Sequence, residues 1–103
     1  MSLLQKLFGI GGPKVDLGQK IKEGATIVDV RTPEEFRSGH VKGAINIPLE
    51  RVHAQMSKLN KNKPVITCCR SGARSAMAAD VLKRSGFECY TGGAWTSVRA
   101  LKG

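Results

Sequence analysis

The stretch "PVITCCRSGARSA" (64–76) joins an apolar run to a short polar loop and then to alanine-rich sequence. Its first six residues form the kind of uniformly apolar run that is typical of a central parallel strand covered on both faces. Gly72 allows a tight turn, and residues 75–86 are rich in good helix formers and end at Gly86. The stretch therefore predicts a strand, a tight loop and a helix in direct succession.

The sequence on both sides repeats this alternation. Strands are predicted at residues 25–30, 44–48, 64–69 and 87–90, and helices at 16–24, 32–39, 49–59 and 75–86, with one more after "GGAW" (92–95). Strands that alternate with helices at these spacings imply βαβ crossovers. We therefore expect an α/β fold, a mostly parallel sheet of four or five strands with helices on both faces.

The helix predicted at residues 32–39 has the clearest boundaries. Thr32 is placed as its N-cap and Pro33 at its first helical position, Glu35 completes a capping box, and Gly39 ends it. The other helix signals are an N-cap at Asp16 with a stop at Gly24, and one apolar face on 49–59 formed by Leu49, Val52, Met56 and Leu59.

A chain of 103 residues is long enough for one domain with one core, and we place that domain at residues 14–103. Residues 1–13 are expected to be a tail or a short amphipathic segment that ends in a glycine-rich linker. Lys6 and Gln5 interrupt any secretory apolar core. The segment is thus a frayed terminus or, as the alternative, an amphipathic foot on a membrane or a partner.

The chain is strongly basic, with 17 Lys and Arg against 8 Asp and Glu and a net charge of +9. This favours anionic partners, from small oxyanions to nucleic acid. The lysines of "KLNKNKP" (58–64) have no aromatic residue among them, so we expect a solvated loop there and no nucleic-acid site. No apolar run approaches the roughly 18 residues that cross a bilayer. Three cysteines form neither a disulfide framework nor a zinc pattern. We expect a soluble cytoplasmic protein without a membrane partner.

A sulfur at position 69 would lie at the carboxyl end of a strand, where parallel sheets bind their ligands. The N–H groups of residues 70–75 can converge on it, as in other strand–loop–helix anion cradles, and Arg70 and Arg74 add positive charge. These groups favour thiolate over thiol, so we expect a lowered pKa for Cys69. The alternative is an inert buried cysteine followed by a polar turn.

Three ordered motifs resemble those of the single-domain rhodaneses, a family of thiosulfate sulfurtransferase-like proteins. "IVDVRTPEEFRSGHVKGAINIP" (27–48) resembles the first signature, an Asp-x-Arg followed by an acidic helix and a glycine-alanine-strand-proline stretch. "CRSGARS" (69–75) resembles the active loop, Cys-x-x-Gly-x-Arg-Ser, and "GFECYTGGAW" (86–95) the closing strand and glycine pair. The resemblance extends over residues 16–101, and it implies a rhodanese-like domain.

The resemblance implies that Cys69 is the catalytic nucleophile and carries a persulfide. It also implies that the loop wraps the transferred sulfur and binds the substrate through Arg70, Ser71, Gly72, Ala73, Arg74 and Ser75. The donor is thiosulfate or a related small anion, the acceptor is cyanide or a thiol, and neither metal nor organic cofactor takes part. Two alternatives stay open: a carrier that passes persulfide sulfur between protein partners, and a non-catalytic interaction module.

Counted from Cys68 instead, the loop has the Cys-x5-Arg spacing of cysteine-dependent phosphatases and arsenate-reductase-like enzymes, with Arg74 as its arginine. Those loops usually have glycine where this chain has Ser71 and histidine where it has Thr67. The loop counted from Cys69 is also narrower, which suits one sulfur better than a phosphate. We therefore expect Cys68 in the core, on the opposite side of the strand, with a resolving or regulatory thiol as the alternative.

The remaining predictions concern residues outside the loop: core positions for Cys89 and Trp95, surface positions for His40 and His53, and a bracing ion pair of Asp29 with Arg31. The histidines are assigned to the surface because the sequence places no second base or ligand beside either one.

Overall fold

The computed structural model describes residues 15–103, so the predicted segment 1–13 lies outside the described residues. Within them, one sheet has the strand order β2-β1-β3-β4, and every pairing is parallel. The strands are β1 (Thr26–Asp29), β2 (Ile45–Asn46), β3 (Val65–Cys69) and β4 (Cys89–Ala94). The predicted α/β class is thereby confirmed, with four strands that are all parallel.

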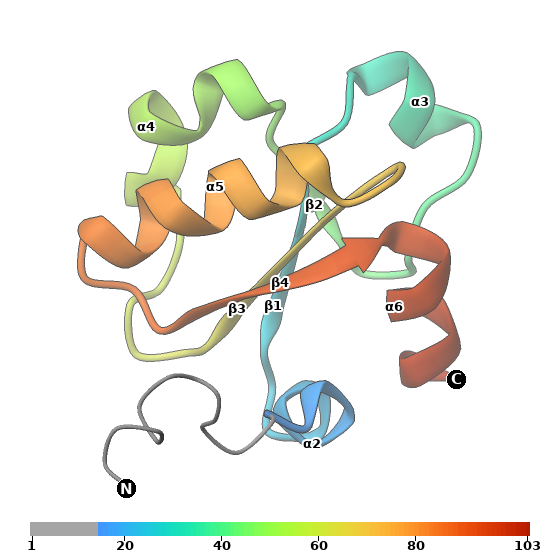
Figure 1. Cartoon of the computed structure of the whole chain (residues 1–103), viewed down its shortest axis with the longest axis horizontal. Helices are drawn as coiled ribbons and strands as arrows, with labels where there is room; N and C mark the ends of the chain where they lie inside the picture. The colour runs from blue at the N-terminus through green and yellow to red at the C-terminus, as the bar shows by residue number, and fades with distance from the viewer. Residues whose placement is uncertain (1–14) are drawn as a thin grey trace, which may run out of the picture.

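Helices cover both faces of this sheet, as predicted. They are α2 (Leu17–Lys22), α3 (Pro33–Arg37), α4 (Val52–Gln55), α5 (Ala73–Arg84) and α6 (Trp95–Lys102). Helices α4 and α5 pack on one face, and α2 and α6 on the other (Figure 1). Helix α3 follows β1, so it stands beyond the carboxyl end of the sheet, the same end at which α5 begins.

Strand β3 lies at the centre of the sheet, and all five of its residues are buried. Its side chains alternate between two apolar clusters. The cluster under α4 and α5 includes Val65 and Cys69, whereas the cluster under α2 and α6 includes Ile66 and Cys68. The adjacent cysteines therefore point to opposite faces of the sheet, as the pleat of a strand requires.

The predicted caps of the first two helices are present. The Asp16 carboxylate accepts from the N–H of Gln19 at 3.1 Å. The Thr32 hydroxyl accepts from the N–H of Glu35, and the Glu35 carboxylate accepts from the N–H of Thr32 at 2.9 Å, which completes the capping box. Local sequence thus determines where these helices begin.

The helix predicted at residues 49–59 is broken into three pieces. A 3-10 turn at Leu49–Arg51 precedes α4, and a second one at Met56–Lys58 follows it. None of these three pieces has a side-chain cap hydrogen bond, so little local bonding favours one continuous helix. Burial of Val52 and Leu59 against the core is retained, and short 3-10 turns adjust the path of the chain between them.

Two boundaries next to the loop that follows Cys69 also differ from the sequence prediction. Helix α5 begins at Ala73, two residues early, because Gly72 with φ of +111° serves as its N-cap. Strand β4 continues through "TGG" instead of turning after Tyr90. A Cβ on Gly92 would lie 2.6 Å from a methyl carbon of Val98 and 2.9 Å from the Thr67 carbonyl oxygen. This glycine therefore permits close packing of β4 against β3 and α6.

Candidate active site

The sulfur of Cys69 lies at the carboxyl end of β3, inside the curl of the loop that leads into α5. The N–H of Gly72 donates to it at 2.9 Å and the N–H of Ser75 at 3.3 Å. Convergence of the loop amides on this sulfur was predicted. The residue is only 1% exposed, so the sulfur lies on the floor of the curl and is more enclosed than a position at the open rim.

These hydrogen bonds set the acidity of the thiol. Burial raises the pKa of Cys69, but hydrogen bonds from Ser75, Gly72 and Ser71 outweigh burial and bring the pKa below its ordinary value. The Ser75 hydroxyl adds to the effect of the amides only in part, because its single proton is also donated to the Gly72 carbonyl. The lowering was predicted, but its main cause is backbone N–H groups and not guanidinium charge.

Ser75 holds the loop in this shape. Its hydroxyl lies 2.9 Å from the Gly72 carbonyl oxygen and 2.9 Å from the Thr91 hydroxyl of β4. Its own carbonyl oxygen accepts from the Thr67 hydroxyl at 2.8 Å. Neither threonine was identified from the sequence as a contact of Ser75. Thr91 lies on the neighbouring strand β4, and Thr67 meets Ser75 only because the loop between them folds back over β3. The result is a loop fastened to β3 and β4 at its helical end.

Arg74 is engaged away from the sulfur. Its guanidinium donates to both carboxylate oxygens of Glu35, at 2.8 and 3.1 Å. The hydrogen bond from Arg74, together with the bond from the Thr32 N–H, lowers the pKa of Glu35 to about 2. The pair joins α3 to the first turn of α5, and so it braces the loop from outside. Glu35 was predicted only as part of the capping box.

The other loop residues face outward. Arg70, Ser71 and Ala73 are exposed. Arg70 borders a cavity of about 230 Å³, which is also lined by Arg31, Glu35, Ser38 and Trp95. The predicted substrate-binding residues thus have different positions. The amides of Gly72 and Ser75 contact the sulfur, the Arg74 guanidinium binds Glu35, and Arg70 borders the cavity.

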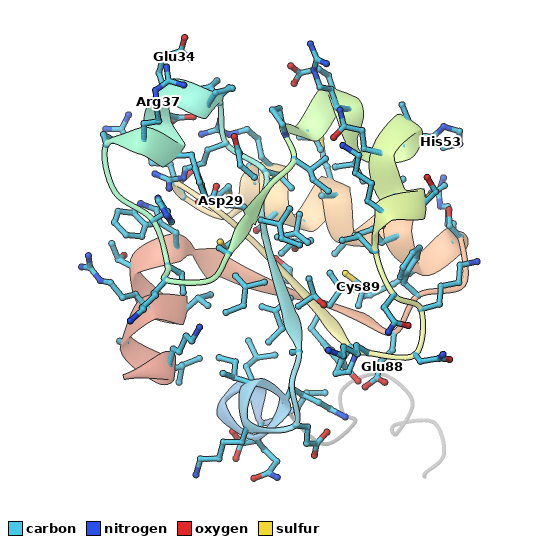
Figure 2. The ribbon with its side chains drawn as sticks, turned by 180° about the vertical axis from the view of Figure 1, so that it is seen from behind. Asp29, Glu34, Arg37, His53, Glu88 and Cys89 are labelled. Atoms are coloured by element: carbon cyan, nitrogen blue, oxygen red, sulfur yellow. The ribbon has the colours of Figure 1, made fainter. Side chains whose placement is uncertain are left out.

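Asp29 and Arg31 form the predicted brace. The Arg31 guanidinium donates to the Asp29 carboxylate at 2.6 to 3.0 Å and to the Gly39 carbonyl oxygen at 2.7 Å. Both side chains are buried, and Asp29 lies in the interior at the end of β1 (Figure 2). Trp95 is partly buried against the cluster under α2 and α6, and the Arg31 guanidinium lies 4.7 Å from its ring centroid. Trp95 is therefore partly exposed, whereas a position in the core was predicted.

The two other thiols are poor nucleophiles in this environment. Burial, with a smaller effect of Asp29, raises the pKa of Cys68 to about 12, and burial raises that of Cys89 to about 11. Both were predicted as core residues, and both are buried. Because the loop amides contact Cys69 and Cys68 faces α6, a phosphatase-type loop centred on Cys68 does not fit this geometry.

Both histidines are at the surface, as predicted. The Nδ1 atom of His40 lies 2.7 Å from the Phe36 carbonyl oxygen, and His53 projects from α4 (Figure 2). His53 borders a larger cavity of about 430 Å³ near the end of α5, which none of the residues 69–75 lines. Among residues 15–103, no group of three His, Cys, Asp or Glu side chains is arranged to hold a metal ion. No helix in the same range is long and apolar enough to span a bilayer.

Comparison with known proteins identifies the family. The family model described as "Rhodanese-like domain" matches residues 14–103. The chain therefore belongs to the rhodanese-like domain family. It also resembles the crystal structure of a rhodanese-related protein from Thermoplasma volcanium, with a TM-score of 0.72 and 30% identity, over 85% of this chain and 87% of that one.

Curated relatives are named for sulfur chemistry. The chain is 41% identical over 66 residues to the putative sulfur carrier protein YrkF of Bacillus subtilis (strain 168). The aligned region covers 64% of this chain and 36% of that protein. The chain is also 37% identical over 65 residues to a sulfurtransferase of Allochromatium vinosum, and this aligned region covers 63% of this chain and 61% of that protein. The chain thus spans less than two thirds of the length of these relatives. The family and these names support a sulfurtransferase-like or sulfur-carrier role.

Proposed function

We propose that the chain is a sulfurtransferase that moves a sulfane sulfur through a persulfide on Cys69. The observation that carries the proposal is the convergence of the Gly72 and Ser75 N–H groups on one sulfur whose pKa is lowered. The other two cysteines have raised pKa values. Since the thiolate is the nucleophile, Cys69 is the cysteine of the three whose environment favours the nucleophilic form.

The reaction takes two steps. The Cys69 thiolate attacks the outer sulfur of thiosulfate; a bond forms between the two sulfurs, the sulfur–sulfur bond of thiosulfate breaks, and sulfite leaves with the electron pair. Cyanide or a thiolate then attacks the outer sulfur of the persulfide, and Cys69 regains its electron pair as thiolate. Covalent catalysis of this kind predicts ping-pong kinetics.

The residues of the loop have different parts in this scheme. The amides of Ser71, Gly72 and Ser75 stabilise the thiolate before attack and after transfer. Arg70 is exposed next to Cys69 and offers its charge to an anionic donor. Arg74 acts through its ion pair with Glu35, which holds the start of α5 in place.

A protein persulfide carrier is the second candidate, because a relative with 41% identity is named as a putative sulfur carrier. In that case the donor or the acceptor is another protein, and thiosulfate serves only as a laboratory donor. Three free cysteines fit a reducing compartment such as the cytoplasm for either candidate.

Mass spectrometry of the intact protein after thiosulfate treatment tests the proposal. We expect a gain of one sulfur that disappears on addition of cyanide. Cys69→Ser should abolish both the mass gain and thiocyanate formation, whereas Cys68→Ser, the matched control one residue away, should retain most of both. Equal losses in the two variants, or turnover of an aryl phosphate in place of thiosulfate, would contradict the assignment.

A further inference from the structure

Thr91 of β4 contacts the loop from outside the stretch 69–75. It is the register partner of Thr67 on β3, and its hydroxyl lies 2.9 Å from the Ser75 hydroxyl, 16 positions away along the chain. The Thr67 hydroxyl bonds the carbonyl oxygen of the same serine at 2.8 Å. Two threonines at paired strand positions therefore hold Ser75, one through its backbone and the other through its side chain.

The direction of the bond between Thr91 and Ser75 follows from the number of protons available. The Ser75 hydroxyl has one proton and lies 2.9 Å from the Gly72 carbonyl oxygen, which can only accept. The Ser75 side chain also contributes to the lowered pKa of Cys69, which requires donation to the sulfur. Whichever of these two acceptors takes the proton, none remains for Thr91. In the bond of 2.9 Å, Thr91 is therefore the donor.

The Ser75 proton can turn from Gly72 to the sulfur without leaving a buried acceptor unpaired. The Gly72 carbonyl oxygen also accepts from the N–H of Ala76 at 3.1 Å, so it keeps a donor. The thiolate of Cys69 carries a full charge and is the stronger acceptor of the two. Because Ser75 and Cys69 are both buried, a bond to the thiolate is strengthened by the low effective dielectric of the interior.

Donation by Thr91 supports this bond in two ways. It holds the Ser75 oxygen in place, and it polarises the Ser75 O–H, since hydrogen bonds in a chain strengthen one another. We propose that Thr91 is a positioning residue that stabilises the thiolate of Cys69 through the hydroxyl of Ser75. This role rests on the proposed sulfur transfer, which needs that thiolate, and it adds a residue of β4 to the site.

Replacement of Thr91 with valine leaves every charge near the sulfur unchanged. The charged and titratable groups at this end of the sheet are Arg74 of α5, Glu35 of α3, Asp29 and Arg31 at the end of β1, Cys68 of β3, Arg70 of the loop, and the exposed Glu50 and Arg51 of the 3-10 turn before α4. Residues 91–94 at the end of β4 contribute none. A change of acidity at Cys69 in this variant therefore reports the hydrogen bond to Ser75.

The rate of alkylation of Cys69 by iodoacetamide, followed against pH with mass spectrometry to identify the modified residue, tests the proposal. Thr91→Val keeps the branched shape and removes the hydroxyl. Below the pKa of the thiol, alkylation should slow roughly twofold to fivefold, and the pH midpoint should rise. Thr91→Ser retains a hydroxyl and should keep the original midpoint. Thr96→Val makes the same exchange at an exposed threonine of α6 and should also leave the midpoint unchanged.

A double-mutant cycle with Ser75→Ala shows whether Thr91 acts through Ser75. Without the Ser75 hydroxyl, Thr91→Val should cause no further shift of the midpoint. A shift of the same size in both backgrounds, or equal midpoints for Thr91→Val and Thr96→Val, would overturn the proposal. Urea denaturation establishes that each variant is folded. If Ser75→Ala does not fold, the difference between Thr91→Val and Thr91→Ser decides.

The alkylation assay needs no sulfur donor, so it separates the role of Thr91 from the sulfur transfer itself. Failure of thiosulfate to form a persulfide would refute the transfer function and leave the midpoints as the measure of Thr91. Where transfer occurs, kcat/KM for thiosulfate below the pKa of Cys69 should fall in Thr91→Val by the same factor as alkylation. An unchanged kcat/KM beside a shifted midpoint would contradict a part for Thr91 in the reaction.

Discussion

Replacement of Gly72 with alanine tests whether the loop amides set the acidity of Cys69. Gly72 has φ of +111°, and its N–H donates to the sulfur at 2.9 Å. A side chain at such a φ strains the backbone by about 1–3 kcal/mol. The atom nearest to an added Cβ is the Gly93 Cα at 3.8 Å, so the strain is conformational and not steric. Rotation of φ toward negative values relieves the strain and turns the N–H away from the sulfur.

The lost hydrogen bond is charge-assisted whenever Cys69 is a thiolate. Such a bond contributes about 1.5–3 kcal/mol, and about 1.4 kcal/mol corresponds to a tenfold change in an ionisation constant. A more basic thiolate recovers part of this loss through greater nucleophilicity. Below the pKa of the thiol, alkylation of Cys69 by iodoacetamide should therefore slow about threefold to tenfold in Gly72→Ala, and the pH midpoint of the reaction should rise.

Gly24→Ala is the matched control for strain. Gly24 has φ of +98°, has no atom within 4 Å of an added Cβ, and follows α2, away from the loop. Urea denaturation should give similar losses of stability for the two variants, about 1–3 kcal/mol each. Only Gly72→Ala should change the alkylation profile, with mass spectrometry to confirm that Cys69 is the residue modified. Coincident profiles for the two variants would refute the role of the amides.

Three further predictions concern stability, each measured by urea denaturation. The pKa of Glu35 is lowered from an ordinary 4.5 to about 2 in the folded protein, so its ion pair with Arg74 stabilises the fold above pH 4.5. This contribution, about 1 kcal/mol for a partly exposed pair, should be lost as the pH falls toward 2. Glu35→Gln should remove this pH dependence of stability. Gly92→Ala should cost about 1–3 kcal/mol, because its Cβ overlaps the neighbouring side chains, and an unchanged midpoint would contradict the close packing. Asp29→Ala should cost about 3–5 kcal/mol by leaving a buried guanidinium unpaired, against less than ~1 kcal/mol for the exposed control Asp80→Ala; similar losses in both would argue against a bracing role.

Features determined by local sequence could be predicted. The capping box of Thr32 and Glu35 depends on residues three apart, and the burial of β3 follows from its apolar run. The position of Cys69 inside the curl follows from a strand that leads through a glycine turn into a helix. In each case the deciding interactions lie within a few residues of one another.

Features that depend on distant contacts could not be predicted. Glu35 and Arg74 are 39 positions apart, and no periodicity relates them. Thr91 contacts Ser75 only because β4 pairs with β3. The extension of β4 through Gly92 depends on packing against Val98 and Ile66, whereas local propensity indicates a turn after Tyr90. Tertiary packing determines all three.

The adjacent cysteines show how register alone can separate a thiol with a lowered pKa from one with a raised pKa. Cys68 and Cys69 differ by one position in β3, and the pleat directs one toward α6 and the other toward α5. Burial dominates at Cys68 and raises its pKa, while the amides at the start of α5 outweigh burial at Cys69. The pairing of Cys68 with Asp29 across β1 and β3 fixes this register. A slip by one residue would exchange the two faces and place the other sulfur under the loop, so the lowered pKa of Cys69 depends on sheet pairing as much as on the loop itself.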